Sequence, residues 1–306
     1  MCNCSCDESD RCNPCGLCPA PKPHVTECDA CDEPCGVEEE HSCALYVAVD
    51  KEDSGKKYDE IAKFEPSGVL LSYLKSKSAF EAPRGIVFDR LNNLYIGTGN
   101  TGAEAGSVIK VKAGSKEISV QPLPAGADIR EVETDDCGNV YAADNENGKV
   151  YTITCDGQAC AAKDVTSAWG LAYDNASKTL YVSSELSGQI TAFSDKIDPL
   201  AGLTNISGAA LLGLALDSNN VLYAAAYNTN KIYKITSNAS EFEAPSACIF
   251  ANLSFSPDYI AFDMFDNLYV RNRDDDSIVK INKQGFLSSL GKIKGSQGLA
   301  AKKPNH

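Results

Sequence analysis

The sequence predicts an all-β protein, a six-bladed β-propeller that is closed by a C-terminal strand and preceded by a small irregular segment rich in cysteine. Two observations carry this prediction. Ten of the 14 cysteines in this 306-residue chain lie in residues 1–43, and residues 44–306 repeat one pattern of alternating apolar residues six times. We therefore expect two domains, a Cys-rich acidic segment over 1–43 and a propeller over 44–306.

Residues 1–43 make the first expected domain. They contain ten acidic and two basic residues, which contribute −8 to the net charge of −14. Because they include almost no Leu, Ile or Phe, they cannot build an apolar core without cross-links. Disulfides or a bound metal would supply their stability. The cysteines concerned are Cys2, Cys4, Cys6, Cys12, Cys15, Cys18, Cys28, Cys31, Cys35 and Cys43.

The spacing of these ten cysteines fits two chemistries. Four of them form the pattern C-x2-C-x12-C-x2-C, which is close to a zinc ribbon: Cys12, Cys15, Cys28 and Cys31. The run from Cys12 to Cys18 also resembles part of a ferredoxin motif, but the fourth cysteine of that motif is missing. We favour disulfide pairs among the ten cysteines, with a zinc or iron–sulfur site as the alternative.

The start of residues 1–43 bears on where the protein resides. It lacks a basic region followed by an apolar stretch, so we expect either a cytosolic protein or a form from which a secretion signal has been removed. Cys2 also fits a bacterial lipoprotein, whose first mature residue is a lipid-bearing cysteine. In that case Met1 would not be native.

Six tyrosines mark the second strand of each expected blade. Each stands in a short segment of alternating apolar residues bounded by Asn, Gly or Asp, which indicates strands joined by tight turns. Successive tyrosines are 40 to 49 residues apart, the length of a four-stranded blade. They are Tyr46, Tyr95, Tyr141, Tyr181, Tyr223 and Tyr269.

The flanking segments predict the neighbouring strands. A second apolar segment follows every tyrosine, beginning at Ile61, Val108, Val150, Ile190, Ile232 and Ile278. An apolar segment that ends in aspartate precedes every tyrosine except the first and predicts the innermost strand of the blade. These aspartates are Asp89, Asp135, Asp174, Asp217 and Asp263.

The ends of the repeat region predict how the ring closes. The first repeat has no innermost strand before Tyr46, whereas Ser296 to Ala301 show the innermost-strand pattern with nothing after it. If this last strand completes the first blade, both sheet edges at the seam are paired. An open β-solenoid, the alternative, would leave its ends unpaired.

The blade pattern resembles a known family. Residues 83–95 read P-R-G-I-V-F-D-x4-L-Y, and in the last four repeats the third strand begins nine residues after the tyrosine. Both features resemble the NHL repeat and the related six-bladed propellers of the gluconolactonase type, over essentially all of residues 44–306. Such propellers include lactonases, lyases and binding or scaffold proteins, so the resemblance implies the fold and leaves the function open.

The resemblance places a site in or over the central tunnel, where the innermost strands begin. Alignment on the strand aspartates gives a ring there of Arg84, Arg130, Trp169, Leu212, Asp258 and Gln297. The next column contains Gly85, Glu131, Gly170, Gly213, Tyr259 and Gly298. From the two columns we expect these residues to bind a ligand or partner: Arg84, Arg130, Glu131, Trp169, Asp258, Tyr259 and Gln297. The alternative is a ring that merely plugs the tunnel.

A metal-dependent, lactonase-like hydrolase with a degenerate site is the main enzymatic alternative. The resemblance implies a divalent cation held by carboxylate and amide oxygens from E-G-P, P-N-G and P-D-G motifs. This sequence keeps only Pro257-Asp258, and Tyr259 replaces the glycine. Two arginines in the same ring would repel a cation. We therefore favour no metal in the tunnel.

Other catalytic arrangements find little support. The three histidines lie outside the blades, so a histidine-dependent mechanism has no base there: His24, His41 and His306. Glu131 and Asp258 are candidates for paired catalytic carboxylates, but we favour ion pairs of these acids with Arg84 and Arg130. We predict no catalytic residue, and the patterns favour a binding protein over an enzyme.

Three further segments carry predictions. Asp50–Lys57 and Thr98–Ser107 are expected to be loops that project from the tunnel-mouth face, where propellers usually bind. Asp274 to Asp276 are expected to form a solvated turn, with weak calcium binding as the alternative. Cys155 and Cys160 flank a short turn between two strand patterns and are expected to form a disulfide.

Composition limits the partners. A sequence pI of 4.7 without a basic stripe argues against nucleic-acid binding, and no apolar run approaches the length of a membrane helix. We expect a secreted or cell-surface propeller, extracellular or periplasmic, that binds a protein or small molecule, with residues 1–43 as anchor or assembly segment. The remaining alternative is a cytosolic redox or scaffold protein with a zinc or iron–sulfur site.

Overall fold

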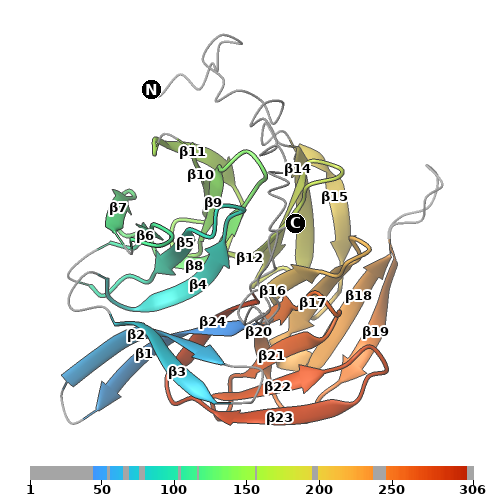
Figure 1. The fold of residues 1–306 in the computed structure, drawn as a ribbon. Coiled ribbons are helices and arrows are strands. Elements are labelled where there is room, and N and C mark those ends of the chain that lie inside the picture. Colours follow the sequence, from blue (N-terminus) through green and yellow to red (C-terminus); the bar gives the residue numbers. More distant parts are fainter. Residues whose placement is uncertain are drawn as a thin grey trace, which may run out of the picture.

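The computed structural model describes residues 44–53, 56–64, 69–75, 80–102, 105–115, 117–155, 157–194, 199–236 and 246–301. The described residues form six four-stranded antiparallel sheets arranged as blades around a central axis (Figure 1). The predicted all-β, six-bladed propeller is therefore confirmed. The ten cysteines of residues 1–43, with their predicted disulfides or metal, lie outside the described residues.

Blade one is closed by the C-terminal strand, as predicted. Its sheet order is β24-β1-β2-β3, with β24 (Ser296–Ala301), β1 (Leu45–Asp53), β2 (Lys56–Phe64) and β3 (Leu70–Lys75). Leu45 pairs with Ala301 and Val49 with Ser296. Backbone hydrogen bonds between the two ends of the propeller thus close the ring, and no sheet edge is left open at the seam.

Blades two to four follow in chain order, and each runs from its innermost to its outermost strand. Blade two comprises β4 (Pro83–Phe88), β5 (Leu94–Thr98), β6 (Ser107–Val111) and β7 (Ile118–Pro122). Blade three comprises β8 (Ile129–Thr134), β9 (Val140–Asp144), β10 (Lys149–Ile153) and β11 (Ala159–Asp164). Blade four comprises β12 (Ala168–Asp174), β13 (Thr179–Ser184), β14 (Gln189–Ser194) and β15 (Pro199–Asn205).

The last two blades complete the ring. Blade five comprises β16 (Leu211–Leu216), β17 (Leu222–Ala226), β18 (Lys231–Thr236) and β19 (Ser246–Asn252), with the 3-10 helix η1 (Tyr227–Thr229) after β17. Blade six comprises β20 (Pro257–Phe262), β21 (Leu268–Asn272), β22 (Ser277–Ile281) and β23 (Leu287–Lys292). Among the described residues, no helix is long and apolar enough to cross a membrane.

A repeated turn explains the aspartates that end the innermost strands. In blade two, Asp89 Oδ1 accepts a hydrogen bond from the backbone N–H of Asn93 at 2.8 Å. Its Oδ2 accepts bonds from the Asn93 side chain at 2.7 Å and from the Tyr95 hydroxyl at 3.3 Å. The same bonds recur in blades three and six, at Asp135 and Asp263. The sequence motif therefore holds the first two strands of a blade together.

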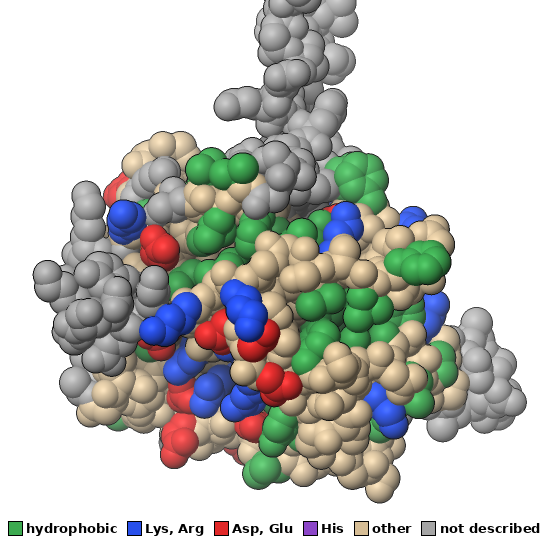
Figure 2. Space-filling view, turned by 90° about the horizontal axis from the view of Figure 1, so that it is seen from below, with side chains coloured by type: hydrophobic (Ala, Val, Ile, Leu, Met, Phe, Trp, Pro, Cys, Tyr) green, Lys and Arg blue, Asp and Glu red, His purple; other side chains and the backbone are tan. Residues whose placement is uncertain are grey.

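The apolar core lies between the blades. Second strands such as β5, β9 and β17 are buried along their whole length, whereas the outermost strands β7 and β23 are largely exposed. Tyr141 of blade three stacks on Tyr173 of blade four, with ring centroids 5.4 Å apart. On the side of the molecule seen in Figure 2, Lys and Arg side chains lie among Asp and Glu, beside hydrophobic side chains. This side is not the uniformly basic surface that nucleic acid requires.

Candidate functional site

The predicted ring residues gather at one end of the tunnel. Each is the second residue of its innermost strand, which places all six at the same level. A cavity of about 290 Å³ opens there, and we call it the tunnel mouth. Its lining includes six of the seven predicted site residues, Arg84, Arg130, Trp169, Asp258, Tyr259 and Gln297, and three that were not predicted, Glu185, Arg271 and Arg273.

Trp169 and Tyr259 form the floor of the tunnel mouth. Their ring centroids lie 4.4 Å apart, and both side chains are buried. The Tyr259 hydroxyl donates a hydrogen bond of 2.9 Å to the backbone carbonyl of Arg130, which belongs to the opposite blade. Burial and the charge of Glu131 raise the pKa of Tyr259, so its hydroxyl stays protonated as a donor. These two rings therefore obstruct the tunnel below its mouth.

Four glycines explain why the tunnel is narrow at this floor. A Cβ at any of them would overlap the backbone of the next innermost strand, as at Gly170 with the carbonyl of Leu212. The strands can approach this closely only without side chains. The glycines are Gly85, Gly170, Gly213 and Gly298. In the two remaining blades the position holds Glu131 and Tyr259.

Asp258 forms a buried ion pair. Its carboxylate pairs with Arg271, which also donates to Asp276 at 2.8 Å and to the Ser296 hydroxyl at 3.1 Å. Burial raises the pKa of Asp258, and the charge of Arg271 acts against that rise. Our prediction that Asp258 and Glu131 pair with Arg84 and Arg130 is wrong. The described partner of Arg130 is Asp128, at 2.6 Å.

The sequence contains a signal for Arg271 that our alignment did not use. Five blades have a small residue two positions after the recurring tyrosine, where the second strand packs against its neighbours: Ala48, Gly97, Ala143, Ser183 and Ala225. In blade six this position is Arg271, which is buried. A buried charged side chain at a position where the other blades have small residues indicates an ion-pair partner, which here is Asp258.

Among the residues that line the tunnel mouth, basic side chains outnumber acidic ones. Arg84 has no ion pair or hydrogen bond among the described residues, and the buried Nε atoms of Arg84 and Arg130 have no hydrogen-bond partner there. Arg273 lies over the Tyr227 ring, 5.3 Å from its centroid. Four arginines thus line a cavity whose acidic lining residues are Glu185 and Asp258. Such a site favours an anion.

The two segments predicted to be loops lie at the tunnel-mouth end, although one of them is mostly strand. The Asp50 N–H donates to the Gly295 carbonyl at 2.9 Å, beside the start of β24. Most of the segment 50–57 is not a loop, because β1 and β2 extend through it. The Asn100 N–H donates to Asp128 at 3.1 Å and so ties segment 98–107 to blade three.

The acidic run 274–276 is held in a turn. Asp274 accepts a hydrogen bond from the N–H of Ser256 at 3.0 Å, and Asp275 pairs with Lys292 at 2.6 Å. Hydrogen bonds from Lys292 and Ser277 lower the pKa of Asp275 to about 2. Within the described ranges, no three His, Cys, Asp or Glu side chains are grouped as a metal site.

Of the predicted site residues, Glu131 lies apart from the others. Glu131 does not line the tunnel mouth but faces a second cavity on the other side of the floor.

Cys155 lies in the turn after β10 and takes part in a disulfide. The side chain of Cys160 lies outside the described residues. Since Cys160 pairs with Thr152 in the backbone register, Cys155 is not directly opposite it, and their pairing stays a prediction.

No known protein-family model and no curated protein matches the chain. Virginiamycin B lyase from Staphylococcus aureus is similar in structure, with 20% identity over 69% of this chain and 70% of the lyase and a TM-score of 0.56. A variant of that lyase in which a histidine is changed to alanine, solved with quinupristin, is described as catalytically inactive.

Two binding proteins are also similar in structure. A chain of a nidogen–laminin complex matches with 13% identity over 85% of this chain and 98% of its own length, at a TM-score of 0.70. An auxiliary nutrient binding protein from Bacteroides thetaiotaomicron matches with 14% identity over 81% of this chain and 64% of its own length, at a TM-score of 0.57. The chain therefore has the six-bladed β-propeller fold seen in lyases and binding proteins alike.

Proposed function

We propose that this chain is a non-enzymatic binding propeller that takes an anionic group, of a small molecule or a partner protein, at the tunnel mouth. The observation that carries the proposal is the arginine excess around the cavity, above all Arg84, which has no described ion pair. A buried guanidinium Nε without a partner is costly, and a bound carboxylate or phosphate would supply the missing acceptor.

A binding role is favoured over catalysis by the chemistry of the same residues. The described residues contain no histidine, whereas the structurally similar lyase has a histidine whose replacement is described as inactivating. Asp258, the one residue that matches a lactonase motif, is engaged by Arg271. A carboxylate already neutralised by an arginine is a poor ligand for a divalent cation.

The proposal includes a secreted or cell-surface location, with residues 1–43 as an anchor or assembly segment. The disulfide at Cys155 supports it, because stable disulfides are typical of oxidising compartments. The structural likeness to an auxiliary nutrient binding protein is consistent with the same location.

Calorimetric titration with benzoate, succinate and inorganic phosphate at low ionic strength tests the site. We expect at least one of these anions to bind, and Arg84→Gln to weaken it by about tenfold, the usual effect of losing one charge-assisted hydrogen bond. Arg90→Gln is the matched control, because Arg90 is exposed and pairs with Asp136 beside the second cavity. Equal affinity of the Arg84→Gln variant and the unaltered protein would contradict the proposal.

The enzymatic alternative has its own experiment. Hydrolysis of a panel of lactones is measured with and without divalent cations, for the unaltered protein and for Asp258→Asn. We expect no cation-dependent turnover. Cation-dependent hydrolysis that disappears in the Asp258→Asn variant would replace the binding proposal with a lactonase activity.

A further inference from the structure

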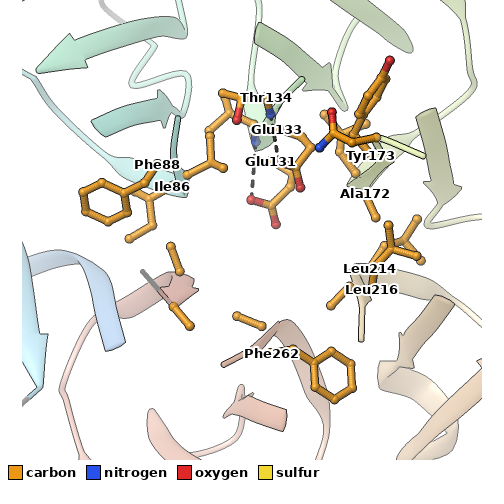
Figure 3. A pocket seen from close by; sticks show the side chains of 18 of the residues that line it. Ile86, Phe88, Glu131, Glu133, Thr134, Ala172, Tyr173, Leu214, Leu216 and Phe262 are labelled. Atoms are coloured by element: carbon orange, nitrogen blue, oxygen red, sulfur yellow. Dashed lines mark hydrogen bonds between the residues drawn. The ribbon is translucent and has the colours of Figure 1, made fainter. Parts of the chain in front are cut away.

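A second and larger cavity lies on the other side of the floor. Its volume is about 640 Å³, within the range of small-molecule sites in proteins. Residues from all six innermost strands line it, so it is the opposite end of the tunnel (Figure 3). Tyr259 and Trp169 separate it from the tunnel mouth.

Apolar side chains from several blades share the walls of this cavity with polar ones. Figure 3 shows Ile86 and Phe88 of β4, Leu214 and Leu216 of β16, and Phe262 of β20 around its circumference. Side chains from different blades thus face one space that they do not fill. The apolar part of this wall provides favourable burial for a hydrocarbon group.

Glu131 places a buried acid beside these apolar side chains. Its carboxylate extends from β8 toward the middle of the ring of strands (Figure 3), and the residue is only 8% exposed. Oε1 accepts a 3.4 Å hydrogen bond from the N–H of Val132, and the described residues provide no ion pair to Glu131. A carboxylate in this setting lacks the cationic partner that buried acids normally have.

The other ionisable groups around the cavity are engaged in the fold. Three aspartates accept hydrogen bonds in the blade turns, Asp89, Asp135 and Asp217. Asp136 pairs with Arg90, the one basic residue of the lining. Glu133 accepts the Thr134 N–H at 2.8 Å and lies next to Glu131 in Figure 3. The charge balance of the cavity is therefore strongly acidic.

We propose that this cavity binds an organic cation, an ammonium group attached to an apolar body about as large as a hexyl or phenylethyl group. Glu131 would accept hydrogen bonds from the ammonium, and the walls formed by Phe88, Leu214 and Phe262 would enclose the apolar body. This site is independent of the anion site proposed above, because the floor separates the two.

The ionisation of Glu131 supports this assignment. Burial raises its pKa well above the ordinary value, and the charges of Glu133 and Asp258 raise it further. A cation bound next to the carboxylate would lower that pKa again. Binding at neutral pH would then release protons, which calorimetry detects as a heat that depends on the ionisation enthalpy of the buffer.

The experiment compares three six-carbon probes with different head groups: hexylamine, hexanol and hexanoate. Calorimetry on the unaltered protein is expected to show hexylamine binding about tenfold more tightly than hexanol, as one charge-assisted hydrogen bond provides, with hexanoate weakest. Equal binding of hexylamine and hexanol, or absence of hexylamine binding, would overturn the proposal. This comparison needs no variant and so does not depend on whether a variant folds.

Two variants test whether Glu131 causes the preference for hexylamine over hexanol. In Glu131→Gln the preference for hexylamine over hexanol should fall to about one, while hexanol binding remains because the walls are unchanged. Retention of the full preference would overturn the role of Glu131. Arg84→Gln is the matched control, since it alters the tunnel mouth and should leave hexylamine binding unchanged. Failure of the anion site and failure of the amine site are thereby distinguished.

Discussion

The hydroxyl of Tyr259 donates a hydrogen bond of 2.9 Å to the backbone carbonyl of Arg130, 129 residues earlier in the chain. The first residue belongs to β20 in blade six and the second to β8 in blade three, so the bond spans the ring. It also lies between the two tunnel cavities. One bond thus contributes to ring stability and keeps an arginine-lined site apart from an acidic one.

Tyr259→Phe tests this bond. The change keeps the ring against Trp169 but leaves the Arg130 carbonyl without its donor, and we expect the free energy of unfolding to fall by about 1 kcal/mol. Denaturant titration followed by Trp169, the single tryptophan of the chain, measures it. Tyr227→Phe is the control, because the Tyr227 hydroxyl makes no hydrogen bond to any described residue. Equal stability of the two variants would show that the cross-ring bond contributes nothing.

The blade turns give a second prediction. Asp263 accepts four hydrogen bonds, from the N–H groups of Phe265 and Asn267, the Asn267 side chain and the Tyr269 hydroxyl. Asp263→Ala leaves these donors without an acceptor in a buried site, so we expect at least about 2 kcal/mol of destabilisation. Thermal or denaturant unfolding measures the loss.

Asp217 provides the matched control for this turn. Val221 replaces the asparagine there, so the Asp217 carboxylate accepts three bonds and is less buried. We expect Asp217→Ala to cost clearly less than Asp263→Ala. A larger loss at Asp217 would mean that the side-chain amide of the motif has no stabilising role.

The blade pattern was sufficient to predict the fold because it arises from local chemistry. Each tyrosine, its aspartate and the turn between them are within six residues of one another, and the same contacts recur around the ring. Even the closure was predictable, since Ser296–Ala301 has the pattern of an innermost strand and no other blade to join. The alignment on these aspartates also placed the ring residues at one level.

The partners of the site residues were harder to predict, because they depend on contacts between strands. Asp258 pairs with Arg271 from the adjacent strand, not with the arginines of its own ring. Glu131 and Arg130 are sequence neighbours, yet they line different cavities at the two ends of the tunnel. Alignment identified both columns but carries no information about where each side chain points.

We predict that the Glu131→Gln variant becomes more stable than the unaltered protein as pH rises. Because the pKa of Glu131 is raised in the folded state, its contribution is fully present below the ordinary carboxyl pKa and is lost as pH rises through the folded-state value. Glutamine does not titrate, so the variant should match the unaltered protein at acidic pH and exceed it at pH 8, by about 1–3 kcal/mol. Unfolding measured from pH 4 to 8 tests this, with exposed Glu117→Gln as control. A gain that is constant with pH would exclude ionisation of Glu131 as its cause.

The disulfide at Cys155 gives the last prediction. We expect peptide mapping under non-reducing conditions to join Cys155 to Cys160, and Cys160→Ser to lower the free energy of unfolding by about 2 kcal/mol, the loop-closure estimate for so short a loop. Cys248→Ser is the control, because Cys248 is an exposed free thiol whose loss removes no cross-link. If Cys155 is joined instead to a cysteine of residues 1–43, the pairing with Cys160 is wrong, and the cysteine-rich segment is covalently held against blade three.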